Sequence, residues 1–193
     1  MEQDWQRFRD SFEKFVIQDL KKALRADVEV GTIVLTAVGI ECLSGYFVGK
    51  KSDDKTFKSF IDKFMPMYSS HAVTLYKCIR NGLAHDYIIK EDSEGKSFLF
   101  TRNRGEKHLI PVESKHGWFY LNREQFALDF LKAQNDFFNQ VESDKTLFEK
   151  AMGRLNKAGF LEVFSFHPTT IFVDPNSDSH EHNGVTGTFP QRH

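Results

Sequence analysis

Residues 30–49 read VGTIVLTAVGIECLSGYFVG, and this stretch decides what the rest of the chain must pack around. It contains one charged residue, Glu41, and is otherwise rich in small and β-branched residues. Because small residues let neighbouring elements approach closely, such a stretch favours a helix that is packed on several sides. We therefore expect a central, tightly packed helix over about residues 30–48. Glu41 would then pair with Arg80, belong to a polar network, or face solvent.

Amphipathic patterns around this stretch predict the rest of a helical bundle. Residues 4–24 place their apolar side chains on one stripe and their charged side chains opposite it, which is the periodicity of a surface helix. We expect further helices over about residues 56–68, 71–90 and 124–158. The chain contains 20 Phe, which we expect mainly in the core, with base stacking by one or two of them as the alternative.

The composition changes between residues 97 and 122. The segments SFLFTR, KHLIPVE and GWFYLNR have strand-like composition and are separated by the turn sequences NRGE and SKHG. They predict a small antiparallel β-meander, inserted into a single domain over residues 1–164. Residues 165–193 are polar and rich in Gly, Ser and His, which predicts a flexible tail. The predicted fold class is therefore mainly α, a helical bundle with a small β insertion.

Charge and cysteine content limit the classes of function. The net charge is −1, whereas non-specific nucleic-acid binders are usually more basic, so any contact with nucleic acid must come from a local patch. The two cysteines, Cys42 and Cys78, have neither the number nor the spacing of a disulfide framework or a zinc site, and free thiols fit a reducing cytosol. The charged N-terminus does not resemble a signal peptide, and Glu29 and Glu41 interrupt the longest apolar stretch. We therefore expect a cytoplasmic protein without a membrane span.

The most informative short stretch is IRNGLAHDY, residues 79–87. On a helical wheel, Asn81 and His85 lie one turn apart on the face away from the apolar stripe, and the small residues between them leave room for a close neighbour. Arg80 and His85 are about 140° apart on an ideal α-helix, so they would diverge within one subunit. We expect a homodimer in which crossing helices bring Arg80 of one copy to His85 of the other.

The sequence Arg80-Asn81-Gly82-Leu83-Ala84-His85 resembles the helix-borne signature of HEPN domains, in which a few residues separate an Arg from a His. The resemblance covers residues 5–90 well and residues 124–158 loosely, and it leaves out the predicted strands and the tail. It implies an HEPN-like helical bundle. Many HEPN proteins are dimeric, metal-independent ribonucleases, often toxins or components of defence against phage. Others are inactive or only bind RNA or nucleotides.

The resemblance also implies roles for individual residues. Arg80 would bind the scissile phosphate, His85 would act as general base or acid, and Asn81 would orient His85 or contact the phosphate. These side chains suit the chemistry, because an imidazole exchanges protons near neutral pH and a guanidinium matches phosphate oxygens. The expected product ends in a 2′,3′-cyclic phosphate, and no metal or cofactor is required.

Three further residues are candidates for binding substrate. Tyr87 would contact RNA, with packing at the edge of the apolar stripe as the alternative. Lys50 and Lys51 would meet backbone phosphates, with a solvated turn as the alternative. Asp86 is expected to be a solvated charge.

Two other patterns give weaker signals. Arg102 and His108 also fit the family's pattern of an Arg, four to six residues and a His, but they lie in a predicted strand and turn, where no helical face exists. His180 and His182 could loosely hold a metal together with nearby acidic residues, but they lie in the predicted tail, so we expect no metal site.

The sequence thus predicts an HEPN-like endoribonuclease, a toxin or defence component, whose partners are RNA, a second copy of the chain, and an antitoxin or other partner protein. The alternative is a non-catalytic module of the same fold that binds RNA, a nucleotide or a protein. A third reading is a helical scaffold that docks partners through its strands.

Overall fold

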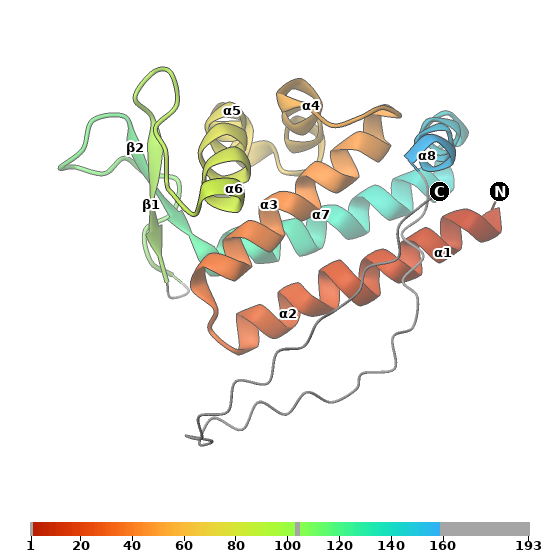
Figure 1. The fold of residues 1–193 in the computed structure, drawn as a ribbon, viewed down its shortest axis with the longest axis horizontal. Coiled ribbons are helices and arrows are strands. Elements are labelled where there is room, and N and C mark those ends of the chain that lie inside the picture. The colour runs from red at the N-terminus through yellow and green to blue at the C-terminus, as the bar shows by residue number, and fades with distance from the viewer. Residues whose placement is uncertain (1, 103–104, 159–193) are drawn as a thin grey trace, which may run out of the picture. The chain divides into compact units, whose positions relative to one another are not determined.

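The computed structural model describes residues 2–102 and 105–158, and its regular structure is mainly helical (Figure 1). The elements in chain order are α1 (Glu2–Phe12), the π-helix η1 (Glu13–Ile17), α2 (Gln18–Arg25), α3 (Glu29–Val48), α4 (Asp54–Phe64), the 3₁₀-helix η2 (Pro66–His71), α5 (Ala72–Thr74), the π-helix η3 (Leu75–Leu83), α6 (Ala84–Asp86), β1 (Ser97–Thr101), β2 (Trp118–Asn122), α7 (Arg123–Ser143) and α8 (Lys145–Ala158). The mainly α fold class is confirmed. The predicted tail, residues 165–193, and the predicted domain end at residue 164 lie outside the described residues.

Two of the predicted helices each combine α-helical segments with a π-helical segment. The residues at the junctions of α1, η1 and α2 keep right-handed helical backbone angles, so these segments form one continuous helix that includes all of the predicted residues 4–24. The segments α5, η3 and α6 are joined in the same way. In η3 the α-helix is replaced by a π-helix, whose hydrogen bonds join residues five apart in sequence.

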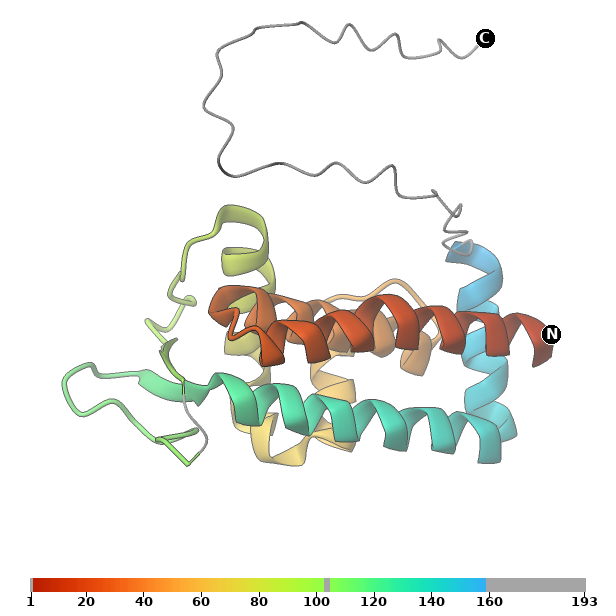
Figure 2. The same cartoon turned by 90° about the horizontal axis from the view of Figure 1, so that it is seen from below.

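Helix α3 is central, as predicted, and packs against α2, α4, α7, α8 and η3 (Figures 1 and 2). A Cβ atom at Gly39 would lie 2.5 Å from Cζ of Phe130, so glycine is required for the α7 ring to pack against the α3 backbone. By length and composition alone α3 could cross a membrane, but 56% of its most apolar window is buried inside the protein. Such burial is typical of a core helix in a helical bundle.

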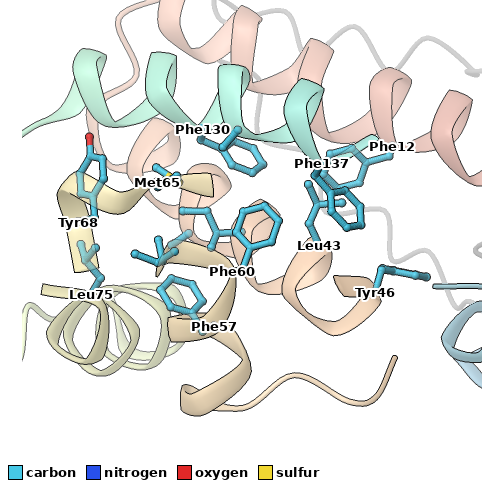
Figure 3. Packing of buried hydrophobic residues seen from close by; sticks show 14 of the residues in the cluster. Phe12, Leu43, Tyr46, Phe57, Phe60, Met65, Tyr68, Leu75, Phe130 and Phe137 are labelled. Atoms are coloured by element: carbon cyan, nitrogen blue, oxygen red, sulfur yellow. The ribbon is translucent and has the colours of Figure 1, made fainter. Parts of the chain in front are cut away.

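Aromatic side chains fill the space between the helices (Figure 3). Phe60 of α4 and Phe137 of α7 are fully buried, and their ring centroids are 5.8 Å apart. Phe137 also meets Phe64 edge-on at 5.7 Å and Phe138 at 5.5 Å. These distances are those of favourable aromatic pairs. The core role predicted for the phenylalanines is confirmed for this cluster.

The predicted antiparallel meander is wrong. Strands β1 and β2 form a two-stranded parallel sheet, in which Ser97 lies opposite Trp118 and Thr101 lies opposite Asn122. The first and third strand-like segments therefore pair directly, and the segment between them connects them as a loop.

The middle segment meets β2 only over a short, irregular stretch. The N–H groups of Leu109 and Val112 donate to the carbonyl oxygens of Tyr120 and Trp118, at 2.7 and 2.9 Å, and Pro111 forms an isolated antiparallel bridge. Leu109 has a left-handed backbone (φ 52°) and Pro111 lacks an N–H group. A regular ladder cannot continue through such residues, which is why no third strand forms here.

Candidate functional site

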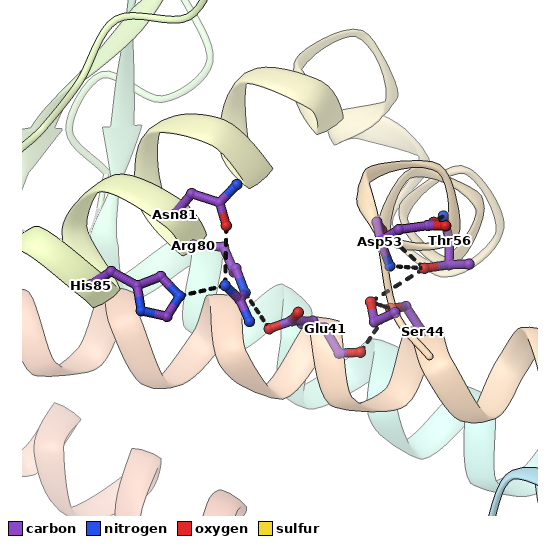
Figure 4. Close-up of polar contacts among 8 residues, drawn as sticks. Glu41, Ser44, Asp53, Thr56, Arg80, Asn81 and His85 are labelled. Atoms are coloured by element: carbon purple, nitrogen blue, oxygen red, sulfur yellow. Dashed lines mark hydrogen bonds and ion pairs between the residues drawn. The ribbon is translucent and has the colours of Figure 1, made fainter. Parts of the chain in front are cut away.

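The π-helix η3 brings Arg80 and His85 together within one chain. The N–H of Ala84 donates to the carbonyl of Ile79, five residues earlier, so side chains five apart become neighbours on one face. Arg80 Nη1 lies 2.5 Å from Nε2 of His85 (Figure 4). The prediction that the two side chains diverge within one subunit is therefore wrong, because it assumed the period of an ideal α-helix.

Arg80 is held by two further groups (Figure 4). Its Nε donates to the Glu41 carboxylate of α3, and its Nη1 donates to Oδ1 of Asn81 at 3.1 Å. The Glu41 side chain is only 15% exposed and that of Arg80 26%, so this ion pair is largely shielded from water. The first of the alternatives for Glu41, pairing with Arg80, is confirmed. Asn81 bonds Arg80 and not the imidazole, because the wider helical turn places Arg80 next to His85.

The Arg80 contact also defines the tautomer of His85. A guanidinium can only donate hydrogen bonds, so Nε2 of His85 accepts and the ring proton is on Nδ1. His85 is exposed, as is Asn81, whereas Arg80 is partly buried between them and Glu41. The site therefore presents a proton acceptor and a cation on the same accessible face.

The small residue Gly82 serves the chain's own backbone. A Cβ atom at Gly82 would lie 2.8 Å from the carbonyl oxygen of Ile88, which passes over the helix after the chain reverses at Tyr87. Tyr87 ends α6 with a left-handed backbone, at φ 55°. At Gly82, the close neighbour is therefore the segment that directly follows the motif.

Replacing Gly82 by alanine is expected to destabilise the protein by about 1–3 kcal/mol, because the clash is with backbone that cannot rotate away. Gly153 of α8 is the matched control, since a Cβ atom there would meet no atom within 4 Å. Its replacement by alanine should stabilise the protein by up to about 1 kcal/mol through helix propensity. Urea unfolding of both variants measures the difference, and equal effects would contradict the close approach at Gly82.

The predicted substrate-binding residues lie in different surroundings. Tyr87 is 80% exposed, so the alternative that it packs at the edge of the apolar stripe is wrong. Lys50 Nζ lies 3.7 Å from the carboxylate of Asp53, whereas Lys51 borders a pocket that Glu41 also lines. Asp86 is exposed, and its hydrogen bond from Lys90 lowers the pKa of its carboxyl group.

Arg102 and His108, the second match to the spacing, have unrelated partners. Arg102 forms ion pairs with Asp27, in the connection before α3, and with Glu29, the first residue of α3. His108 Nδ1 accepts from the backbone N–H of Asn122 at 3.0 Å, so its proton is on Nε2, which lies 3.0 Å from the hydroxyl of Tyr68. Arg102 and His108 therefore fit the spacing pattern, but their contacts serve to hold the fold together.

His108 belongs to a half-buried network that the sequence analysis missed. The Tyr68 hydroxyl donates to the Asp129 carboxylate at 2.7 Å, and burial raises the pKa of Tyr68. Burial lowers the pKa of His108, because it disfavours the imidazolium form. His108 lies in the strand-like segment 107–113, and nothing there indicates this network, since Tyr68 and Asp129 are distant in sequence.

We expect acid to destabilise the protein partly through His108. Its pKa is lower in the folded than in the unfolded chain, so the unfolded chain binds the proton first as the pH falls below about 6.5, and stability decreases. His108→Gln should cost about 1–2 kcal/mol at pH 7.5 and show a smaller further loss at pH 5.5 than the wild type. Urea unfolding at both pH values tests this, with exposed His116→Gln as the control. An unchanged pH dependence in His108→Gln would contradict it.

The thiols and the metal-ligating groups supply no further site. Burial raises the pKa of Cys42 to about 12 and that of Cys78 to about 11, so neither is a reactive thiolate. Within residues 2–102 and 105–158, no group of three or more His, Cys, Asp or Glu side chains is arranged to hold a metal ion. His180 and His182 lie outside the described residues.

Comparison with known proteins adds no relative. No family model, no curated protein and no solved structure matches the chain.

Proposed function

We propose that this protein is an HEPN-like, metal-independent endoribonuclease whose reaction centre is formed by Arg80 and His85. The observation that carries the proposal is the direct contact of the two side chains on one exposed face, with Glu41 fixing the guanidinium from behind. A guanidinium cation beside an imidazole supplies both groups needed to cleave a phosphodiester next to a ribose 2′-hydroxyl.

In the proposed reaction, Nε2 of His85 takes the proton of the 2′-hydroxyl. The 2′-oxygen attacks phosphorus, the bond from phosphorus to the 5′-oxygen breaks, and the products are a 2′,3′-cyclic phosphate and a 5′-hydroxyl. Arg80 turns its Nη groups from His85 to the phosphate oxygens and stabilises the charge that develops on them, while Nε stays bound to Glu41. Before substrate binds, Asn81 helps to orient the guanidinium by accepting from its Nη1.

We also propose a homodimer, in a different role from the one first expected. A second copy is not needed to bring Arg80 to His85, but it would supply a second imidazole, which in its protonated form gives the leaving 5′-oxygen the proton of the 5′-hydroxyl product. Exposed apolar side chains beside the motif support an interface here: Tyr87 is 80% exposed and Ile88 58%. On α3, Val38 is 43% exposed. Apolar groups that cluster on a surface often mark such contacts.

The direct test is incubation of the purified protein with end-labelled RNA in the presence of a metal chelator. Cleavage that yields 2′,3′-cyclic phosphate ends supports the proposal. RNA binding without cleavage would instead identify the non-catalytic binding module, which is the alternative that the near-neutral net charge of −1 mildly favours. A role as a toxin or in defence, held in check by an antitoxin, follows from the resemblance and would appear as growth arrest on expression in the cytoplasm.

A further inference from the structure

Glu41 also borders a pocket of about 240 Å³ that the proposed reaction does not use. The pocket lies between α3, the α3–α4 connection and α8. Its lining residues are Val38, Glu41, Cys42, Gly45, Tyr46, Lys51, Ser52 and Arg154. It is smaller than pockets for drug-sized ligands and is of a size for a small charged group.

The lining of this pocket carries uncompensated positive charge. Lys51 and Arg154 form no ion pair within the part of the chain that the structure describes. The one carboxylate in the lining is Glu41, which is already paired with Arg80. The nearby Asp53 accepts from Thr56 at the start of α4 and lies close to Lys50. An anion that enters the pocket would therefore face two cations that have no ion-pair partner among residues 2–102 and 105–158.

Arg154 carries a second indication of a missing partner. Its Nε is buried and has no hydrogen-bond acceptor among the described residues. A buried N–H without an acceptor is unfavourable and calls for a ligand or an ordered water. A Cβ atom at Gly45 would lie 3.6 Å from this Nε and 3.0 Å from the Lys50 carbonyl oxygen, so glycine keeps this end of the pocket open. The Ser52 hydroxyl adds a polar group, linked to Ser44 at 2.7 Å.

We propose that this pocket binds a phosphate group of the same RNA strand that Arg80 and His85 cleave, with Arg154 and Lys51 as its ligands. The inference rests on the proposed function for the identity of the strand. A guanidinium fork and a lysine ammonium are the side chains that phosphate esters engage most readily. Because Glu41 both lines the pocket and pairs with Arg80, the pocket lies next to the proposed reaction centre.

The test measures binding of a 2′-O-methyl oligoribonucleotide, which lacks the attacking hydroxyl and cannot be cleaved. Lys51→Gln and Arg154→Gln should each weaken binding about tenfold and reduce the slope of log affinity against log salt by about 0.7, the loss of one phosphate contact. Exposed Lys55→Gln on α4 and Lys157→Gln on α8 remove the same charge outside the pocket and serve as controls. Lys51 is exposed, so its replacement tests the pocket even if Arg154→Gln folds poorly.

Two results would overturn the inference. If the pocket variants behave like the two controls, the pocket does not bind phosphate. If they lose affinity for adenosine monophosphate while oligonucleotide binding is unchanged, the pocket serves a free nucleotide and not the strand. Either result is separable from failure of the proposed function, because cleavage by the wild type and its loss in His85→Ala are measured without reference to the pocket.

Discussion

Cleavage of RNA is expected to fall by about 100-fold or more when either Arg80 or His85 is replaced by alanine. Removal of the imidazole takes away the group that accepts the 2′-hydroxyl proton, and general base catalysis contributes about 100- to 10,000-fold. Removal of the guanidinium takes away the charge that stabilises the transition state, an effect of about 100- to 1,000-fold per donor. The rate of appearance of 2′,3′-cyclic phosphate ends measures both effects.

The experiment on Arg80 needs one variant in which Glu41 keeps a positively charged partner. Because the Glu41 side chain is 15% exposed, Arg80→Ala would leave a largely buried carboxylate without its partner and could unfold the site. Arg80→Lys retains a positive charge for Glu41 but cannot hold Glu41 and the phosphate with one planar group, so it should also lose most activity. His116→Ala and Arg25→Ala, at exposed positions away from the motif, should cleave like the wild type. Full activity of Arg80→Lys and His85→Ala would refute the assigned roles.

Phe137→Ala is expected to lower the free energy of unfolding by about 3–5 kcal/mol, the largest effect on stability. Phe137 is fully buried, and its ring lies between those of Phe60, Phe64 and Phe138. The surrounding helices cannot close the cavity without moving α4 relative to α7, so both burial and aromatic contacts are lost. Urea unfolding followed by circular dichroism gives the value.

Phe15→Ala is the matched control for this substitution. Phe15 is partly exposed and lies outside the buried core cluster, with Lys14 Nζ 5.1 Å from its ring centroid. Its loss should cost about 1 kcal/mol or less, since little apolar area returns to water. If the two substitutions cost the same, the buried aromatic cluster is not the main source of stability.

The sequence by itself determined the elements whose signal is local. The apolar stretch around Glu41 predicted a central helix, and α3 is that helix. The apolar stripe over residues 4–24 likewise predicted a helix, because its period can be read from consecutive residues. The abundance of Phe predicted an aromatic core, because Phe side chains prefer to be buried. The motif at 80–85 identified Arg80, Asn81 and His85 as candidate site residues, but it did not predict that Arg80 meets the other two on one face.

Only the tertiary structure decided how these elements are joined. A helical wheel assumes the α-helical period, so it separated Arg80 from His85, whereas the π-helix brings them together. The pairing of Arg80 with Glu41, 39 residues away, and the parallel register of β1 with β2 depend on packing between segments distant in sequence. Such contacts are selected by the burial and hydrogen-bond satisfaction of the whole chain, which no local window of the sequence contains.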